Sequence, residues 1–425
     1  MSEKLTFIDL FAGAGGLSEG FIRAGYDPVA HVEIDKAACN TLTTRTAFHY
    51  LKDTGGFKTY KEYLRGAVSR DDLYRDIPKE LQASVLNYAI GPENNAAIFS
   101  TIDRLIYDKG IQNQVDLIIG GPPCQAYSLV GRARSENGMK KDPRNYLYKQ
   151  YTTFLEKYRP KMFVFENVIG LKSAKNGAYL RDMERLFFQK GYKMQLFTLE
   201  ANRFNVLQKR RRVIIIGWRG DFAPTLPDLE GMNLYTGNKV ASVFDDLPPL
   251  NAGDGVDKYQ RYAGGANSYL SAAGIRNGIK ELTQHIARPH TRQDKDIYRI
   301  AVEQWNNEGK RLDYNDLPAG LKSHNNRASF VDRFKVVADN LNYSQTIVAH
   351  ISKDGHYYIH PDIEQNRSIS VREAARLQSF PDDFYFEGIK QEGSRTAAFK
   401  QIGNAVPPVM AFKIAEEINK VLCQK

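Results

Sequence analysis

The sequence predicts an α/β fold built around a mostly parallel β-sheet. Short apolar runs alternate with helix-like segments through the first half of the chain, which is the pattern of repeated β-α-β units. Glycine-rich or polar motifs follow several of these runs directly, and ligands of such sheets bind at the carboxyl ends of the strands. The chain has 425 residues, of which 42% are hydrophobic, so a large core is available.

The expected elements can be placed in order along the chain. Strands are predicted at 5–11, 29–34, 115–119, 162–165, 194–199 and 213–218, and helices at 17–24, 370–379 and 407–422. Two further apolar runs, 346–351 and 356–359, flank a Lys-Asp-Gly turn and predict a β-hairpin. The last helix is expected to return and pack beside the first strand.

Changes in composition divide the chain into three parts. Residues 1–220 are expected to form the α/β domain, with a polar, Tyr- and Lys-rich helical insertion at about 40–95. Residues 221–343 contain many Gly, Asn, Asp and Pro residues and few strand patterns, so we predict a second, smaller domain there. Residues 344–425 then complete the first domain.

The excess of basic residues indicates a polyanionic partner. The formal net charge is +10, and clustered Lys and Arg attract the phosphates of nucleic acids. Basic residues crowd two stretches, 132–144 and 209–212. High solubility is the simpler interpretation of the charge, and the charge by itself does not decide between the two.

The chain lacks the sequence features of membrane, secreted and zinc proteins. No apolar run approaches the roughly 18 residues that span a bilayer, and the first residues lead directly into a strand pattern rather than a signal peptide. The three cysteines, Cys39, Cys124 and Cys423, are too few and too scattered for a disulfide framework or a zinc site. We therefore expect a cytoplasmic protein without a membrane partner.

Histidines and arginines cluster inside the predicted second domain, at His285, Arg288, His290 and Arg292. Metal binding is one interpretation of the two histidines, but no metal-ligand spacing accompanies them. DNA contact or surface structure explains these residues more simply, so we predict no metal site.

The first candidate site is the glycine-rich loop after the first strand. In FIDLFAGAGGLSEGF, residues 7–21, a strand ends in a GAGG run and a helix follows. Glycines there allow the backbone to approach a ligand closely, and Glu33, at the end of the second strand, is placed to bind a ribose diol. The spacing departs from the nicotinamide motif GxGxxG, and a tight turn without a ligand is the alternative. The loop therefore indicates a nucleoside cofactor without identifying it.

The second candidate site centres on Cys124 in the motif GGPPCQAYS. A free cysteine is usually a small buried hydrophobe, but one that follows two prolines at a strand end can be a rigidly held nucleophile. Three other motifs border strands or a helix: FVFENV contains Glu166, QKRRRVIIIG contains Arg210 and Arg212, and QIGNAVPP contains Asn404. Each alone has a structural explanation, as a helix cap, a solvated face or a turn. Together on one α/β scaffold they predict a catalytic site.

The order of these motifs resembles that of the DNA (cytosine-5) methyltransferases, in particular the bacterial restriction-modification type. The similarity covers about 7–216 and 346–408, through FIDLFAGAGG, GGPPCQAYSLVGRAR, FENV, QKRRR, SVREAARLQSFPDDF and QIGNAVPP. The resemblance implies a Rossmann-like fold that depends on S-adenosylmethionine. Residues 1–220 and 344–425 would form its catalytic domain, and 221–343 would be a smaller target-recognition domain.

Transferred residue by residue, the resemblance implies two sets of site residues. The cofactor pocket would contain Phe11, Ala14, Gly16, Glu33, Leu147, Asn404 and Val406. The catalytic residues would be Cys124, Glu166, Arg210 and Arg212. The residue that contacts the adenine ring is left unassigned, because the stretch at 97–103 does not align clearly with the acidic position of the family.

The residue types match the chemistry that the resemblance implies. C5 of cytosine is a poor nucleophile, but addition of the Cys124 thiolate to C6 gives C5 enamine character and divides one difficult step into easier ones. Glu166 can supply a proton to N3, and Arg212 can bind O2 and favour the thiolate. The target base must leave the duplex to be reached.

We expect a monomer on double-stranded DNA, at the nucleoid if bacterial, with a cognate restriction endonuclease as functional partner.

Three alternatives stay open at the level of the sequence. An RNA (tRNA) cytosine-5 methyltransferase would share the chemistry, although the long segment between the two halves of the catalytic domain favours DNA. A catalytically silent nucleic-acid-binding relative would not need the four residues Cys124, Glu166, Arg210 and Arg212 together. A nicotinamide oxidoreductase would leave the cysteine motif unexplained. A methyl-transfer assay that compares DNA with RNA discriminates among these possibilities.

Overall fold

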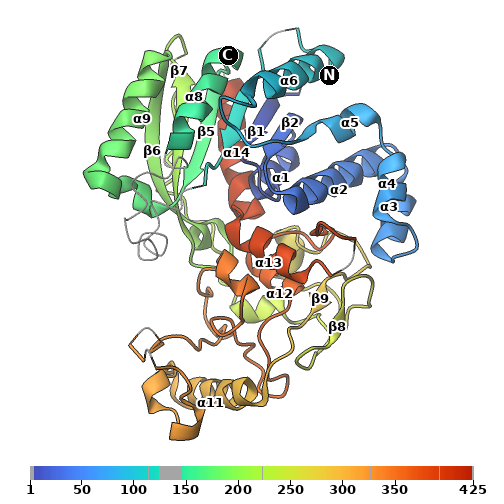
Figure 1. The fold of residues 1–425 in the computed structure, drawn as a ribbon, viewed down its shortest axis with the longest axis vertical. Coiled ribbons are helices and arrows are strands. Elements are labelled where there is room, and N and C mark those ends of the chain that lie inside the picture. Colours follow the sequence, from blue (N-terminus) through green and yellow to red (C-terminus); the bar gives the residue numbers. More distant parts are fainter. Residues whose placement is uncertain are drawn as a thin grey trace.

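A computed structural model gives the structure of the chain. It describes residues 4–112, 114–123, 146–222, 224–325, 327–328, 330–391 and 393–423. Figure 1 shows an upper lobe built on a β-sheet and a lower lobe with little strand structure. Cys124 and the basic stretch 132–144 lie outside the described residues.

The upper lobe contains one seven-stranded sheet in the order β3-β2-β1-β4-β5-β7-β6. Its strands are β1 (Thr6–Leu10), β2 (Asp27–Glu33), β3 (Val85–Asn87), β4 (Leu117–Gly120), β5 (Met162–Asn167), β6 (Tyr192–Glu200) and β7 (Arg211–Arg219). Of these described strands, β7 alone runs in the direction opposite to the other six, so it pairs antiparallel with both β5 and β6. The prediction of an α/β fold with a mostly parallel sheet is confirmed, and each of the six expected strands is present.

Helices cover both faces of the sheet and continue into the lower lobe (Figure 1). The α-helices are α1 (Gly16–Arg23), α2 (Lys36–Asp53), α3 (Phe57–Leu64), α4 (Arg70–Arg75), α5 (Lys79–Ala83), α6 (Asn95–Asp108), α8 (Leu147–Tyr158), α9 (Ala178–Gln189), α10 (Ser268–Ala272), α11 (Arg292–Glu308), α12 (Val371–Leu377), α13 (Arg395–Asn404) and α14 (Pro408–Cys423). The 3-10 helices are η2 (Ile169–Lys172), η3 (Ala174–Gly177), η4 (Ala201–Phe204), η5 (Val240–Val243), η6 (Tyr314–Asp316), η7 (Ala319–Leu321) and η8 (Ala349–Ser352). A helix long and apolar enough to cross a bilayer does not occur in the described ranges.

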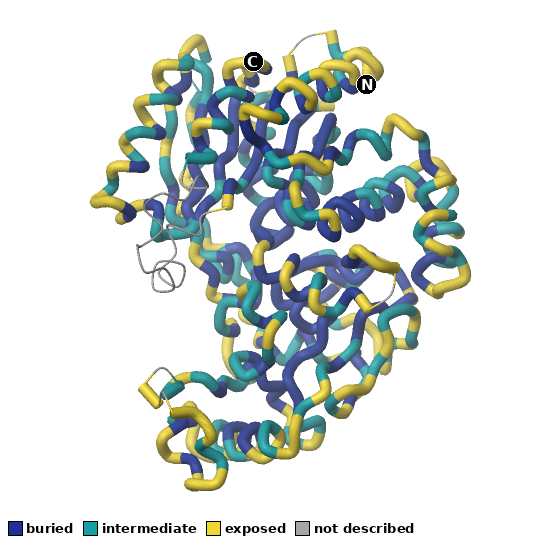
Figure 2. Tube along the Cα trace, in the orientation of Figure 1, coloured by how far each residue is buried: buried dark blue, intermediate teal, exposed yellow. Residues whose placement is uncertain are grey.

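Successive strand residues belong to two different apolar clusters, one on each face of the sheet. In β1, Phe7 packs in the cluster that contains α1 and α14, whereas Ile8 packs in the cluster that contains α6, α8 and α9. In β5, Val164 and Phe165 divide in the same way. Because both faces are covered, these strands form continuous apolar runs in the sequence, and Figure 2 shows them buried. Each fully buried apolar side chain contributes about 1.5–3 kcal/mol to folding.

The C-terminal helix α14 packs against α1. A Cβ added at Gly20 of α1 would lie 2.4 Å from the Cβ of Ala411, so a side chain does not fit there. Tyr26 Oη donates a hydrogen bond to the Ala415 carbonyl at 3.2 Å. The predicted helix is present; it packs mainly against α1, and its apolar side chains share one core cluster with Phe7 of β1.

The insertion predicted at 40–95 is largely helical. It contains most of α2, then α3, α4 and α5, and ends near β3, the edge strand of the sheet. A three-residue strand is too short for hydrophobic periodicity to detect, which is why β3 was not predicted. The insertion has its own apolar cluster, which includes Phe48 and Tyr60 and extends to Ile279 and Tyr385 of the lower lobe.

The lower lobe combines chain segments that are far apart in the sequence. It includes α10, α11 and the strand pair β8 (Gly255–Val256) and β9 (His285–Ile286), and also α12 and α13 from the C-terminal part (Figure 1). A small apolar cluster that includes Ile297 and Tyr298 packs α11 against later segments. The domain boundaries at 220 and 343 stay a prediction.

The hairpin predicted at 346–359 is not formed. The helix η8 lies inside this segment, and Ile359 makes only isolated bridges to residues outside it. Side chains already bond the backbone of the expected first strand: Ile347 N donates to Gln208 Oε1 at 2.9 Å, and Arg210 Nη1 donates to Ile347 O at 2.6 Å. Because buried backbone groups need one partner each, these contacts take the place of a strand ladder.

Candidate active site

The glycine-rich loop between β1 and α1 has a conformation suited to a ligand. Phe11, Gly13 and Gly15 have φ angles of 59°, 56° and 81°. The left-handed region costs roughly 1–2 kcal/mol for a residue with a Cβ, so Phe11 marks a constrained position. A Cβ added at Gly16 would lie 2.3 Å from Val406 O, which explains the glycine that begins α1. The structure therefore brings the loop and the segment after α13 together.

Glu33 closes the loop from the end of β2. Its Oε2 accepts from Gly13 N at 2.8 Å, and its Oε1 accepts from Asp35 N at 2.8 Å. Burial raises the pKa of Glu33, and the hydrogen bonds from the backbone oppose that rise. The neighbouring Ile34 exposes 67% of its surface beside this carboxyl group. No sequence pattern indicates Ile34, because a single apolar residue at a strand end is not distinctive.

Asp9 is a buried carboxyl group in β1, directly before the loop. Ser18 Oγ donates to Asp9 Oδ2 at 2.5 Å. Burial raises the pKa of Asp9 to about 8, while the Ser18 hydrogen bond lowers it and the charge of Glu33 raises it further. Asp9 is therefore mostly protonated at neutral pH, which avoids a second buried negative charge near Glu33.

The other predicted cofactor residues come from three elements. Ala14 is buried within the loop, and Val406 is buried beside Gly16. Asn404 is the last residue of α13 and is exposed. Leu147 is half-buried at the start of α8, a helix on the opposite face of the sheet from α1.

Glu166 and Arg212 form an ion pair at the carboxyl end of β5. Arg212 Nε lies 2.6 Å from Glu166 Oε1, and 12% of each side chain is exposed. Because β7 runs antiparallel to β5, with Ile214 opposite Glu166, the start of β7 meets the end of β5. Partial removal from water strengthens the attraction between the two charges. The structure thus joins two residues that the sequence predicted as catalytic.

The described residues before Cys124 lie against the Glu166–Arg212 pair. A Cβ added at Gly121 would be 2.6 Å from Glu166 Oε2, so the chain passes next to this carboxyl group. Asn167 Nδ2 donates to Pro122 O at 3.2 Å and fixes the next residue. The chain therefore enters the segment that contains Cys124 beside the Glu166 carboxyl group.

Arg210 has a different environment from Arg212. It is fully buried, and it donates from Nη1 to Ile347 O at 2.6 Å and from Nη2 to Gly403 O at 3.0 Å. These bonds connect the start of β7 to the segments before η8 and at the end of α13. The geometry favours a positioning role for Arg210, and its predicted catalytic role stays a prediction.

The histidines of the predicted second domain take part in packing. His285 hydrogen-bonds through Nε2 to Pro248 O at 2.8 Å and through Nδ1 to Ser370 Oγ at 2.9 Å, and His290 Nε2 bonds to Ser368 Oγ at 3.0 Å. Burial lowers the pKa of both histidines to about 4, so both are neutral at pH 7. Within the part of the chain that the structure describes, no three His, Cys, Asp or Glu side chains are grouped so as to hold a metal ion.

Known proteins resemble the whole chain. The family model for C-5 cytosine-specific DNA methylase matches residues 5–60 and 93–420. The type II methyltransferase M.Bpa9945I of Bacillus paralicheniformis is 40% identical over 447 residues, which cover 98% of each chain. The type II methyltransferase M.DdeI of Desulfomicrobium norvegicum is 30% identical, over 98% of this chain and 88% of that one.

Solved structures share the fold. A candidate DNA modification methyltransferase encoded within an E. coli prophage superposes with a TM-score of 0.63 at 21% identity, over 99% of this chain and 100% of that one. The S. pombe Dnmt2 methyltransferase superposes with a TM-score of 0.52 at 13% identity, over 98% and 99% of the two chains.

Proposed function

This chain belongs to the C-5 cytosine-specific DNA methylase family and is a DNA (cytosine-5)-methyltransferase, and we propose that Cys124, Glu166 and Arg212 carry out its chemistry. The observation that supports this assignment best is the 2.6 Å contact between Arg212 Nε and Glu166 Oε1. The pair borders Gly121, where the chain enters the segment with the cysteine.

In the proposed mechanism, the Cys124 thiolate forms a bond to C6 of a flipped-out cytosine. The electrons of the C5–C6 double bond shift through C4 to N3, which takes a proton from Glu166. C5 then has the electron density to accept a methyl group. A water molecule from solvent then takes the C5 proton, the C5–C6 double bond re-forms as the thiolate of Cys124 leaves C6, and the N3 proton returns to Glu166. Arg212 holds Glu166 in place and presents its guanidinium to O2.

S-adenosylmethionine would bind at the loop between β1 and α1, and its sulfonium group supplies the activated methyl group. Glu33 fits a ribose diol, because two backbone N–H groups fix the orientation of its carboxylate. The exposed Ile34 side chain offers an apolar surface beside it. Asn404 and Val406 would complete the pocket from the end of α13. Full activity in excess chelator is expected, and a loss that a divalent ion restores would contradict the proposal that no metal takes part.

The lower lobe is proposed to read the DNA sequence, through residues 246–343. Its polar, basic and aromatic side chains are suited to contacts with base edges. The two relatives are named type II methyltransferases, so we also propose that methylation protects DNA from a cognate restriction endonuclease and that the enzyme acts as a monomer.

Two experiments test these proposals. Bisulfite sequencing of DNA treated with the purified protein should reveal C5 methylation at one short target sequence, whereas RNA should remain unmodified. Transfer of residues 246–343 into a relative with a different target should transfer the target site. Methylation that keeps the specificity of the recipient would overturn the assignment of the lower lobe.

A further inference from the structure

The helix α2 connects the proposed cofactor site to the lower lobe. Asp35, two residues after Glu33, caps this helix by accepting from Ala37 N at 3.0 Å. Lys400 Nζ of α13 lies 2.7 Å from Asp35 Oδ2. Further along, the side of α2 faces residues 383–389 of the lower lobe, which we call the 383–389 turn. One rigid helix therefore contacts both regions.

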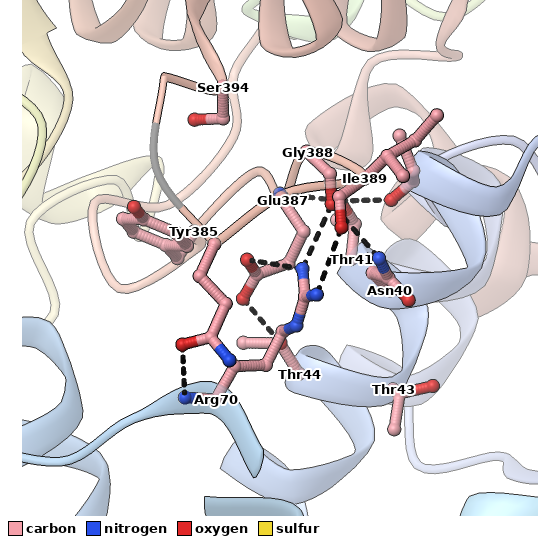
Figure 3. A network of polar contacts seen from close by, with 12 residues as sticks. Asn40, Thr41, Thr43, Thr44, Arg70, Tyr385, Glu387, Gly388, Ile389 and Ser394 are labelled. Carbon is pink, nitrogen blue, oxygen red and sulfur yellow. Dashed lines mark hydrogen bonds and ion pairs between the residues drawn. The ribbon is translucent and has the colours of Figure 1, made fainter.

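Glu387 is the buried centre of the contact between the insertion and the 383–389 turn (Figure 3). Its Oε1 accepts from Thr44 Oγ1 of α2 at 2.7 Å and from the hydroxyl of Tyr63 in α3. The Glu387 N–H donates to Thr41 Oγ1 at 2.8 Å. A buried carboxyl group without such donors would be costly, so the turn depends on the insertion for its polar partners.

Arg70, at the start of α4, binds the same turn through a two-pronged contact (Figure 3). Its Nη1 donates to Gly388 O at 2.9 Å and its Nη2 donates to Ile389 O at 3.0 Å. Nη1 also lies 3.6 Å from Glu387 Oε2, and Asn40 Nδ2 of α2 donates to Gly388 O at 2.9 Å. Because the guanidinium plane is rigid, two simultaneous bonds fix the orientation of the turn as well as its position.

Arg45 of α2 extends the contact to the helix of the cofactor loop. Its Nη2 lies 2.6 Å from Glu19 Oε1 in α1, and its Nη1 lies 2.7 Å from Asp383 Oδ1 at the start of the turn. Tyr60 Oη of α3 donates to Asp383 O at 2.6 Å. The carboxyl group of Asp383 also accepts from Asn277 of the lower lobe. This buried chain of contacts runs from α1 to the lower lobe.

Lys258 of the lower lobe inserts between two aromatic rings at the same interface. Its Nζ lies 3.6 Å from the ring centre of Tyr63 and 4.0 Å from that of Tyr385. Both distances are within the range of a cation–π attraction, which is stronger away from water. The insertion therefore contacts the lower lobe at a second point beside Glu387, through the ring of Tyr63 and the ammonium group of Lys258.

The part of the chain that makes several of these contacts lies outside the family match. The family model leaves residues 61–92 unmatched, and this range contains Tyr63 and all of α4. The contact of Arg70 with the turn is thus additional to the part of the fold that the family model covers.

We propose that Arg70 is a positioning residue: through the 383–389 turn, it fixes the lower lobe at the angle that lets DNA reach the active site. This inference rests on the proposed role of the lower lobe in binding DNA. In this proposal Arg70 acts through its protein contacts with the turn and not by direct contact with DNA or cofactor. Without its two-pronged contact, the lobe would spend only a fraction of the time at the competent angle, and the apparent affinity for DNA would be multiplied by that fraction.

The test compares Arg70→Ala with Arg75→Ala in the full-length enzyme. Arg75 lies in the same short helix and is a matched control. Within the described part of the chain, its one ion pair is with Asp72 at the surface. For Arg70→Ala we expect the KM for target DNA to rise about tenfold, as when the competent orientation is populated about one tenth of the time. The KM for S-adenosylmethionine and the kcat should change less than about threefold by the same reasoning. Arg70→Lys should recover part of the DNA affinity, because an ammonium group reaches only one carbonyl at a time.

The split between the two KM values separates positioning from a purely structural role. A variant that only lowers the fraction of folded enzyme would reduce kcat and leave both KM values unchanged. If Arg70→Ala does not fold, Thr44→Val takes its place in the test, because it removes one hydroxyl donor from Glu387 at nearly constant volume. Thr44→Val should also raise the KM for DNA. Equal KM values for DNA in Arg70→Ala and Arg75→Ala, or equal increases for DNA and cofactor, would overturn the proposal. The segment transfer described above tests the recognition role separately, because it reads target choice rather than affinity.

Discussion

The sheet of the upper lobe and the region around α12 in the lower lobe are held together in different ways. In the sheet lobe, the β7 residues Val213, Ile214, Ile215 and Ile216 are fully buried and pack alternately on the two faces. The lower lobe instead encloses what we call the buried polar cluster, which consists of Arg367, Arg372, Glu373, Arg376 and Asp382. Apolar packing is non-directional and tolerates conservative changes, whereas each buried charge requires its own partners.

The partners in the buried polar cluster are specific. Arg376 donates to Asp382 through Nε at 3.0 Å and through Nη2 at 2.6 Å, and its Nη1 lies 2.6 Å from Asp246 Oδ1. Arg367 donates to both oxygens of Glu373 at 2.7 Å. Burial by itself would raise the pKa of Glu373, but the charge and hydrogen bonds of Arg367 together with the neighbouring His360 and His285 lower it. The cluster therefore joins α12 to segments on either side of it by charge rather than by apolar area.

This difference separates the effects of substitutions. Of the proposed catalytic residues, Glu166 and Arg212 lie at the carboxyl end of β5 and are not members of the apolar clusters, so their loss should change the rate more than the stability. Loss of a charge in the buried polar cluster should do the reverse. Four predictions test this contrast, from the largest expected effect to the smallest.

The largest effect is expected for Cys124→Ser. A hydroxyl group offers almost no anion near neutral pH, so turnover should fall at least ~10⁴-fold while the melting temperature stays close to that of the wild type. DNA with 5-fluorocytosine at the target should trap the wild type covalently when S-adenosylmethionine is present, because fluorine cannot leave C5 as a cation. The variant should give no adduct.

Cys39→Ser and Cys423→Ser are the controls for this experiment. Burial raises the pKa of Cys39 to about 12, so it remains a thiol, and Cys423 is exposed in the last helix. Both variants should keep the adduct and most of the activity. Near-normal turnover by Cys124→Ser would disprove the nucleophile assignment and the mechanism with it.

Glu166→Gln is expected to have the next largest effect. An amide cannot give a proton to N3, and the loss of a general acid lowers the rate by about 10²–10⁴-fold. Binding of target DNA should remain within a few-fold of the wild type, measured by fluorescence anisotropy. Equal losses of binding and turnover would indicate that Glu166 serves only to hold Arg212.

Arg376→Met should lower stability strongly, by about 3–5 kcal/mol, because it leaves Asp382 and Asp246 without their buried partner. In the sheet lobe, Ile214→Val should cost only about 0.5–1.5 kcal/mol. Urea unfolding of both variants measures the two values. Similar losses in the two variants would remove the contrast between the interiors.

Asp9→Asn should alter the pH dependence of stability. The pKa of Asp9 is about 8 in the fold and 3.8 for an isolated group, so between these values the folded state binds one proton more than the unfolded state. Stability from this group is therefore complete below pH 3.8 and is lost as the pH rises towards 8. Relative to the wild type, the variant should gain up to about 1.4 kcal/mol per pH unit from pH 5 to 7. A constant difference over this range, measured by urea unfolding, would contradict the raised pKa.

The sequence by itself determined the fold class, six of the seven strands and the candidate site. Those strands are continuous apolar runs because both of their faces are buried, and that pattern is local. The site motifs are local as well, since Glu166 and Arg212 each border one apolar run. That the two residues meet was decided by the tertiary structure, because Arg212 lies at the start of β7 and the antiparallel direction of this strand brings its start to the end of β5.

Only the tertiary structure decided the roles of residues whose partners are distant in the sequence. Arg210 and Arg212 lie two positions apart in one motif, yet Arg210 is fully buried against the carbonyls of Ile347 and Gly403, while Arg212 faces Glu166. Contacts between remote segments also explain why the predicted hairpin is not formed and why Arg70 binds the 383–389 turn. Hydrophobic periodicity records which residues are buried, but a polar group accepts whichever donor or acceptor the fold brings to it. That choice depends on contacts between remote segments, which no local pattern encodes.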